Sequence, residues 1–394
     1  MNLDHPLPLL GGISPNTFMR KYWQRKPLLI RQAIPGFKPS LSIADIKTLV
    51  KREEVESRLI WHDDKGWHMK SGPLERLPGA RKPNWTVLAQ NVDAHDDAMA
   101  ELMHQFRFIS DARLDDAMIS IATEGGGVGP HFDSYDVFLL QAVGRRRWRI
   151  SGQKDLSLMP GLPLKILSHF RAEEDFELEP GDMLYLPPHI AHDGVAQGDC
   201  MTISIGFRAP TAGALARGLL DAAGDQIMAR LGDTGGLYAS PPLPGPTLDA
   251  RYKDRGIHAT THPAELPEAL ISAALEAVRR VPFTPQLAAR FLGQWLTEPS
   301  QAAWFQPGDQ TLDLLDGIPD EGLLKLDRCS RLMYRDNSVF INGEVAAIAA
   351  KPWLRQLADE RQISCAALRK ARPSAEALEM LNAWLDDGWI HYLI

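Results

Sequence analysis

The sequence predicts an α+β protein in three parts: a β-sandwich or barrel within residues 1–208, a helical region over 209–300 and a winged-helix-like unit over 301–394. Between about residue 115 and residue 208, short β-branched and aromatic runs alternate with Gly and Pro turn signals, which is typical of a sandwich or barrel. After Pro210, apolar residues recur every three or four positions, as in amphipathic helices. Because strand runs do not alternate with helical segments, the pattern disfavours a doubly wound parallel sheet.

The composition is that of an ordinary globular protein. The chain has 394 residues, a length typical of two or three domains, and its 44% hydrophobic and 24% charged residues exclude intrinsic disorder. Its 43 Lys and Arg against 50 Asp and Glu leave a formal net charge of -7, which disfavours a general electrostatic nucleic-acid binder. No apolar run reaches the ~18 residues that span a bilayer and no secretory signal is recognisable, so we expect a cytoplasmic protein that binds no membrane.

Local signals place the first elements. Ser42 with Asp45 resembles a capping box that opens a helix in IADIKTLVKRE. The runs AMISIAT, YDVFLLQ, RRWRI, FELEPGDMLYLPP and MTISIGF indicate strands. The three cysteines, Cys200, Cys329 and Cys365, are too far apart for a disulfide framework or a CxxC zinc pair.

The helical region begins with TAGALARGLLDAAGDQIMARLG, in which one set of apolar residues has helical spacing: Leu215, Leu219, Leu220, Ile227, Met228 and Leu231. A Gly- and Pro-rich loop follows, and helices resume at AELPEALISAALEAVRRV. Thr284 and Pro285 supply an N-cap and a first-turn proline for one more helix. We expect these helices to form an intramolecular bundle or a platform for dimerisation.

The last part has the order strand, hairpin, helices, which resembles a winged helix. Residues 305–394 contain 10 Lys and Arg against 14 Asp and Glu. A DNA-binding winged helix needs cationic side chains for the phosphates. We therefore expect this part to contact protein and to make no direct contact with DNA.

Two short motifs carry the chemistry: GP-His131-Phe132-Asp133 and, about 60 residues later, PP-His189-Ile190-Ala191-His192. If the first motif lies in a strand, His131 and Asp133 project from the same face. A distant histidine, His189 or His192, would complete a 2-His-1-carboxylate facial triad, the arrangement of non-haem iron(II) oxygenases. The alternative is that these histidines are ordinary core residues.

Strand alternation in GRRRWRI places Arg146 on the same face as two large apolar residues, so Arg146 points into the barrel. A buried guanidinium needs an anionic partner. That partner is either an Asp or Glu inside the barrel or a dicarboxylate co-substrate such as 2-oxoglutarate, whose carboxylate an arginine binds in a bidentate way.

Four further residues are candidate contacts. Thr202 and Ser204 share one face of a late strand and either orient the co-substrate or pack with backbone hydrogen bonds. Glu124, beside a run of three glycines, and Tyr135 are candidate substrate contacts, and the alternative for Glu124 is a solvated carboxylate.

Four stretches together resemble the Jumonji-C ribosomal oxygenases, and most closely their bacterial members. They are YWQRKPLLIRQA, GGGVGPHFDSYDVFLLQAVGRRRW, PGDMLYLPPHIAHDGVA and ISIGFRAP. The resemblance covers nearly the whole chain and implies a double-stranded β-helix catalytic domain, a helical dimerisation region and a C-terminal winged helix.

The resemblance also implies a function. It assigns His131, Asp133 and His192 as metal ligands and Arg146 as the residue that binds the distal carboxylate of 2-oxoglutarate. The family uses iron(II), 2-oxoglutarate and O2 to hydroxylate a ribosomal protein side chain, and its bacterial members act on the β-carbon (C3) of an arginine in large-subunit ribosomal protein number sixteen. At one position the chain departs from the family, because Thr202 stands where a small polar amide is frequent.

Several other functions share part of this pattern. A histidine hydroxylase or an N-methyl demethylase would use the same Jumonji chemistry. A cupin-type isomerase or small-molecule dioxygenase would have a similar barrel, usually with more histidines at the metal. A transcription regulator would use the C-terminal part on DNA, which its acidic charge disfavours.

Overall fold

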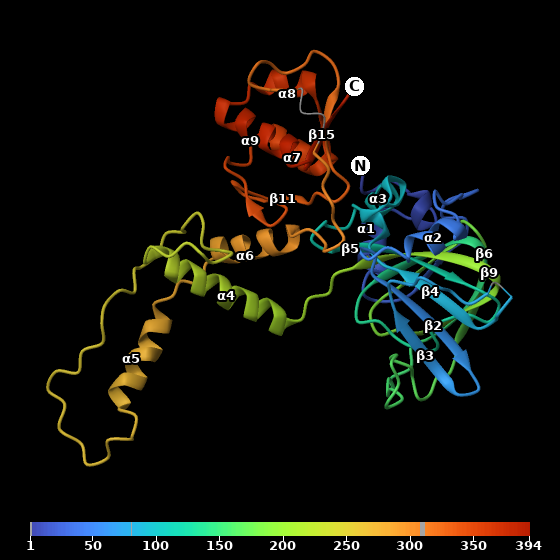
Figure 1. The fold of residues 1–394 in the computed structure, drawn as a ribbon, viewed down its shortest axis with the longest axis horizontal. Coiled ribbons are helices and arrows are strands. Elements are labelled where there is room, and N and C mark those ends of the chain that lie inside the picture. The colour runs from blue at the N-terminus through green and yellow to red at the C-terminus, as the bar shows by residue number, and fades with distance from the viewer. Residues whose placement is uncertain (1, 80, 308–311) are drawn as a thin grey trace. The chain divides into compact units, whose positions relative to one another are not determined.

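A computed structural model describes residues 2–79, 81–307 and 312–394. The chain divides into two compact units, one formed by residues 1–209 with 300–304 and the other by residues 210–299 with 305–394 (Figure 1). The predicted helical and winged-helix parts thus fall within one unit. Within the described ranges, no helix combines the length and apolar character that crossing a bilayer requires.

The first unit is built on one antiparallel sheet in the order β1-β8-β6-β9-β5-β4-β2-β3, with β7 paired to β6. Its strands are β1 (Leu28–Ile30), β2 (Ser57–Asp63), β3 (Gly66–Ser71), β4 (Trp85–Ala89), β5 (Leu114–Ala122), β6 (Val137–Ser151), β7 (Glu174–Leu178), β8 (Met183–Leu186) and β9 (Ala191–Phe207). The long strands β6 and β9 pair over almost their whole length, with register shifts after Gln141 and Val143. This is the predicted double-stranded β-helix type of core.

Short helices cover one face of this sheet. They are η1 (Pro8–Leu10), α1 (Pro15–Lys21), α2 (Ile43–Leu49), η2 (Val92–Ala94) and α3 (Asp97–His104). The predicted capping box is confirmed, because the Ser42 hydroxyl accepts from the Asp45 backbone N–H and the Asp45 carboxylate accepts from the Ser42 backbone N–H.

Alternate residues of β6 serve two separate cores. Phe138 and Leu140 belong to the large core that also contains residues of the helices. Val137 and Leu139 belong to a smaller core with Trp148 on the opposite face. Because successive strand side chains point to opposite faces, the same strand closes the large core and lines the face that carries the functional side chains.

The second unit begins with three helices, α4 (Ala212–Arg230), α5 (Glu268–Arg279) and α6 (Pro285–Thr297). Helices α4 and α6 lie side by side (Figure 1), and Gly218 of α4 faces the ring of Phe291 so closely that a β-carbon there would come within 2.2 Å of it. The predicted apolar stripe of α4 is only partly buried. Leu220 and Met228 are exposed, because the packed face consists mainly of small residues such as Ala222 and Ala223.

The rest of the second unit contains two three-stranded sheets, β14-β10-β15 and β11-β12-β13, and three helices. The elements are β10 (Leu323–Leu326), β11 (Leu332–Arg335), β12 (Ser338–Ile341), β13 (Glu344–Val345), α7 (Pro352–Glu360), β14 (Gln362–Ser364), α8 (Cys365–Ala371), α9 (Ala375–Asp386) and β15 (Ile390–Leu393). One apolar core joins these helices to both sheets. The predicted order of strand, hairpin and helices is confirmed.

Candidate metal centre

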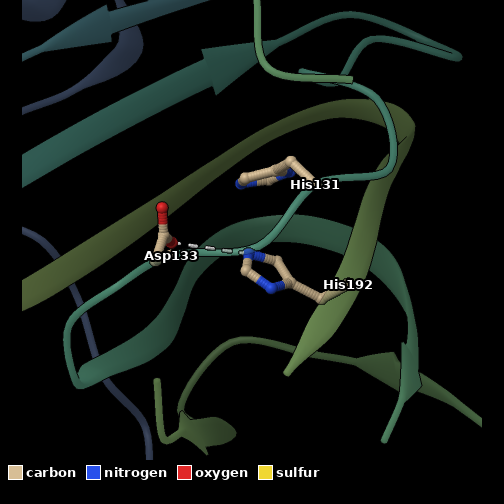
Figure 2. A group of neighbouring side chains, drawn as sticks. All are labelled: His131, Asp133 and His192. Carbon is tan, nitrogen blue, oxygen red and sulfur yellow. Dashed lines mark ion pairs between the residues drawn. The ribbon is translucent and has the colours of Figure 1, made fainter. Parts of the chain in front are cut away.

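Three side chains meet at the start of β9. His131, Asp133 and His192 each offer one ligand atom, and these atoms lie within 4.8 Å of one another. Figure 2 shows the two imidazoles and the carboxylate facing a common point, with His192 Nε2 3.6 Å from Asp133 Oδ2. Two imidazoles and one carboxylate form the donor set of a facial triad with open positions, which fits divalent iron.

The backbone fixes the orientation of both imidazoles. His131 Nδ1 lies 2.8 Å from the Gly129 carbonyl oxygen, and His192 Nδ1 lies 2.9 Å from the Ile190 carbonyl oxygen. An Nδ1–H that donates to a carbonyl leaves the lone pair on Nε2, where it can bind a metal. Burial and the neighbouring His131 lower the pKa of His192 to about 4, so this imidazole is neutral at neutral pH, as a metal ligand must be.

His131 and Asp133 come together for a different reason from the one predicted. Neither lies in a regular strand, because β6 begins only at Val137. Instead, His131 forms an isolated antiparallel bridge with His192, with backbone N–H to carbonyl distances of 2.9 and 2.8 Å. A third backbone hydrogen bond, from His189 N–H to the Asp133 carbonyl at 2.7 Å, fixes the same loop. Backbone hydrogen bonds to the segment 189–192, and not strand alternation, therefore bring His131 and Asp133 together.

The other candidate histidine, His189, is exposed and contributes no ligand atom to this cluster. Its backbone is left-handed, with a φ angle of 65°. The centroids of the His189 and Phe132 rings are 5.7 Å apart. The structure thus brings His192, and not His189, to His131 and Asp133.

A pocket of about 320 Å³ adjoins His131, Asp133 and His192. The candidate contacts Arg146, Thr202, Ser204 and Tyr135 all contribute to its lining. Arg146 is 5% exposed, as strand alternation predicts, while Arg145 and Arg147 lie outside in ion pairs with acidic residues of β7. Within the described residues Arg146 has no carboxylate partner, its Nε makes no hydrogen bond, and its Nη2 contacts the Cys200 sulfur at 3.4 Å. A buried guanidinium without an anion fits a site for a ligand carboxylate.

The hydroxyl of Thr202 has a partner that the sequence did not indicate. Gln141 is fully buried at the β6 irregularity, where its Nε2 donates to the Val143 and Gly144 carbonyls. Its Oε1 therefore accepts from Thr202 Oγ1 at 2.9 Å. Because this hydrogen bond uses its only proton, the Thr202 hydroxyl faces the pocket as an acceptor, while Ser204 beside it is 6% exposed.

The two candidate substrate contacts lie in different places. Tyr135 is at the pocket and 39% exposed. Glu124 is outside the pocket lining, and its carboxylate accepts from the Gly198 backbone N–H at 2.6 Å. That hydrogen bond gives the exposed Glu124 carboxylate a local role in a turn, which favours the alternative of a solvated carboxylate over a substrate contact.

Sequence reasoning missed Asp116 of β5, which also lines the pocket. It accepts from the Asn91 backbone N–H at 3.0 Å, and no ion pair with a cation forms in the described parts of the chain. Burial, together with Asp93, Asp115 and Glu56, raises the pKa of Asp116 to about 7. The only signal in the sequence was the pair Asp115-Asp116 directly before the predicted strand run AMISIAT, where an inward carboxylate is costly without a partner.

Comparisons with known proteins identify the family. Residues 101–215 match the JmjC domain, and residues 274–391 match the ROXA-like winged helix. The chain is 30% identical to the ribosomal protein uL16 3-hydroxylase of Escherichia coli over 376 residues, which covers 94% of this chain and 96% of that relative. The chain belongs to the JmjC ribosomal oxygenases. A probable ribosomal oxygenase of Haemophilus influenzae is 37% identical over 223 residues, 55% of each chain.

Solved structures of a ribosomal oxygenase have the same fold as this chain. An X-ray structure of E. coli YcfD matches this JmjC oxygenase with a TM-score of 0.80 and 28% identity, covering 96% of this chain and 98% of that one. YcfD in complex with cobalt and 2-oxoglutarate matches with a TM-score of 0.76 over 96% of this chain and 97% of that one. The predicted fold class and the predicted enzyme class, a 2-oxoglutarate-dependent oxygenase, are both confirmed.

Proposed function

We propose that this oxygenase hydroxylates C3 of an arginine side chain in ribosomal protein uL16. The reaction uses iron(II), 2-oxoglutarate and O2. Arginine is the proposed target because Asp116, which forms no ion pair with a cation among the described residues, lines the same pocket as His131, Asp133 and His192. The E. coli relative is named for 3-hydroxylation of uL16, which supports the same target here.

His131, Asp133 and His192 would hold the iron through Nε2, a carboxylate oxygen and Nε2. When bound, iron(II) with 2-oxoglutarate and O2 supplies the oxidising power that converts a C–H bond into an alcohol and releases succinate and CO2. The protein contributes the orientation of its ligands, which the carbonyls of Gly129 and Ile190 fix.

Arg146 would bind the distal carboxylate of 2-oxoglutarate. The burial of its guanidinium and the absence of a protein carboxylate beside it, within the described chain, leave its charge for a ligand. Anchoring one end of the diacid directs its other end, the 2-oxo acid, toward the metal ligands.

The substrate side chain would lie along a row of three β5 residues, Asp116, Met118 and Ser120, which share one face and all line the pocket. Across the row, β9 supplies Ser204 opposite Met118, and Gly206 lies near Asp116, where a β-carbon would come within 3.2 Å of the Asp116 carboxylate. In this row, the Asp116 carboxylate would pair with the guanidinium of a substrate arginine. The apolar Met118 side chain would pack on the methylene groups of the same arginine. A neutral imidazole would leave the Asp116 charge without a partner.

The test is the binding of an arginine-containing uL16 peptide to Asp116→Asn, with Glu124→Gln as the matched control. We expect Asp116→Asn to weaken peptide binding about tenfold or more, because it removes one charge-assisted interaction, and Glu124→Gln to change it little. If Glu124→Gln is the damaging variant, or if a histidine peptide binds better than the arginine peptide, the proposed arginine site is wrong.

We also propose a homodimer formed through α5. Supporting it, α5 has no buried residue, and a set of its apolar side chains is exposed: Leu270, Ile271, Leu275 and Val278. An exposed apolar face of this kind is typical of an interaction surface.

A ribosomal protein as substrate further supports action in the cytoplasm. The acidic charge of the winged helix supports contact with protein and not with DNA.

A further inference from the structure

Trp148 occupies the register position between the two ends of the proposed co-substrate site. In the pairing of β6 with β9, Ile150 lies opposite the metal ligand His192, and Trp148 lies opposite Gly194. The next inward position of β6 is Arg146, opposite Ala196. Any ligand that spans from the metal to the Arg146 guanidinium must pass this position.

The side-chain contacts agree with the register. The Trp148 ring centroid is 5.9 Å from that of His192, and the Arg146 guanidinium carbon is 5.9 Å from the Trp148 centroid. Trp148 is 5% exposed and lines the same pocket as the three ligands. The indole therefore forms a wall that reaches from the metal ligand to the carboxylate anchor.

The indole N–H is buried and has no hydrogen-bond partner among the residues that the structure describes. Leaving a buried donor unpaired is unfavourable, so such groups usually have a partner. The benzene half of the ring is held against Gly194, where an added β-carbon would lie 2.6 Å from Cζ3 and Cη2. The ring atoms nearest to Gly194 all belong to the six-membered ring of the indole, so the N–H is not part of this contact with β9.

We propose that the Trp148 indole N–H donates a hydrogen bond to an oxygen of the bound 2-oxo dicarboxylate, between the metal and Arg146. Trp148 is then a binding residue for the co-substrate, and Gly194 is the position that makes room for it. This inference rests on the proposed use of 2-oxoglutarate and adds a donor to the Arg146 anchor.

The chain offers a matched control in Trp85. Its indole nitrogen is also buried and has no partner within the described part of the chain, and Trp85 is 1% exposed, but it does not line the pocket. Trp148→Phe and Trp85→Phe therefore remove the same chemical group from equally buried positions. Only the first removal should affect 2-oxoglutarate if the N–H contacts the ligand.

The experiment titrates 2-oxoglutarate into full-length protein loaded with Zn(II), which supports binding without turnover, and measures the Kd by calorimetry. We expect Trp148→Phe to raise the Kd about tenfold, the size expected for one hydrogen bond to a charged group, with Zn(II) affinity unchanged. Trp85→Phe should leave the Kd within about twofold of wild type.

A second readout uses the wild-type protein, so it does not depend on how the variants fold. In an NMR spectrum of the tryptophan side chains, the Trp148 indole N–H resonance should shift when 2-oxoglutarate binds, while that of Trp85 should not. If wild type binds 2-oxoglutarate but the Trp148 resonance stays in place, or both variants bind as wild type does, the inference is wrong. If wild type binds no 2-oxoglutarate, the proposed function itself fails.

Discussion

The imidazole of each histidine in the proposed metal centre is oriented by one backbone carbonyl, so the centre depends on individual residues more than on the strands around it. We expect His131→Ala to lower metal affinity and turnover by more than about a hundredfold while the fold remains, since one of three ligands is lost. His189→Ala removes an exposed histidine from the neighbouring turn and should leave metal affinity unchanged. Cobalt titration of both variants measures this, and metal affinity retained in His131→Ala would contradict the assignment.

Arg146 can be tested against its outward neighbour on the same strand. Arg146→Ala should raise the KM for 2-oxoglutarate about a hundredfold, because it removes a buried bidentate partner of the distal carboxylate. Arg147→Ala removes an exposed guanidinium that pairs with Asp175, and its effect should be small. An unchanged KM in Arg146→Ala would make Arg146 a structural residue.

The raised pKa of Asp116 predicts how substrate binding depends on pH. With a pKa of about 7 the carboxyl is mainly neutral at lower pH and mainly charged at higher pH. A guanidinium needs the charged form, so affinity for an arginine peptide should fall about tenfold from about pH 8 to about pH 6. In Asp116→Asn this dependence should disappear, and a pH profile that persists there belongs to another group.

Among the elements, β6 was the most predictable and the loop before it the least. The period of two in GRRRWRI placed Arg146 and Trp148 inside correctly, because alternation is a local property of a strand. The meeting of His131 with His192 depends on a bridge between distant segments, and the Gln141 contact on a register shift in β6. Asp116 could not be assigned because its significance lies in the pocket that it faces.

Helix α6 packs on β12 through a glycine, and this contact gives a test within the second unit. A β-carbon at Gly293 would lie 2.3 Å from the buried Phe340 ring. Gly293→Ala should therefore destabilise this unit by about 1–3 kcal/mol. Gly224→Ala, where nothing lies within 4 Å, should be neutral or stabilise α4 by up to about 1 kcal/mol. Denaturant unfolding compares the two, and equal effects would contradict the packing described here.

At the scale of the whole molecule, the exposed face of α5 predicts the assembly. Leu275→Asp should convert a dimer into a monomer, because it places a charge in the apolar surface that the dimer would bury. Glu276→Arg, which changes charge beside that face, should leave the dimer intact. Sedimentation velocity distinguishes the two states, and a monomeric wild type would contradict the proposed dimer.

The net charge of -7 also acts at this scale. Ribosomal proteins that bind RNA are basic, so an acidic enzyme attracts such a substrate over a long range and raises the encounter rate at low salt. The same charge opposes binding to DNA phosphates. The opposite charges of enzyme and substrate thus favour a protein target over a nucleic acid.

Arginine hydroxylation on the ribosome is the central claim, and mass spectrometry tests it most directly. Ribosomal proteins are compared from cells with and without this chain. We predict that one arginine of uL16 carries the mass of one additional oxygen atom only when the chain is present, and that its fragment ions place the oxygen on C3. A uL16 protein with the same mass in both cells, or an added oxygen on a histidine of another ribosomal protein, would contradict the account.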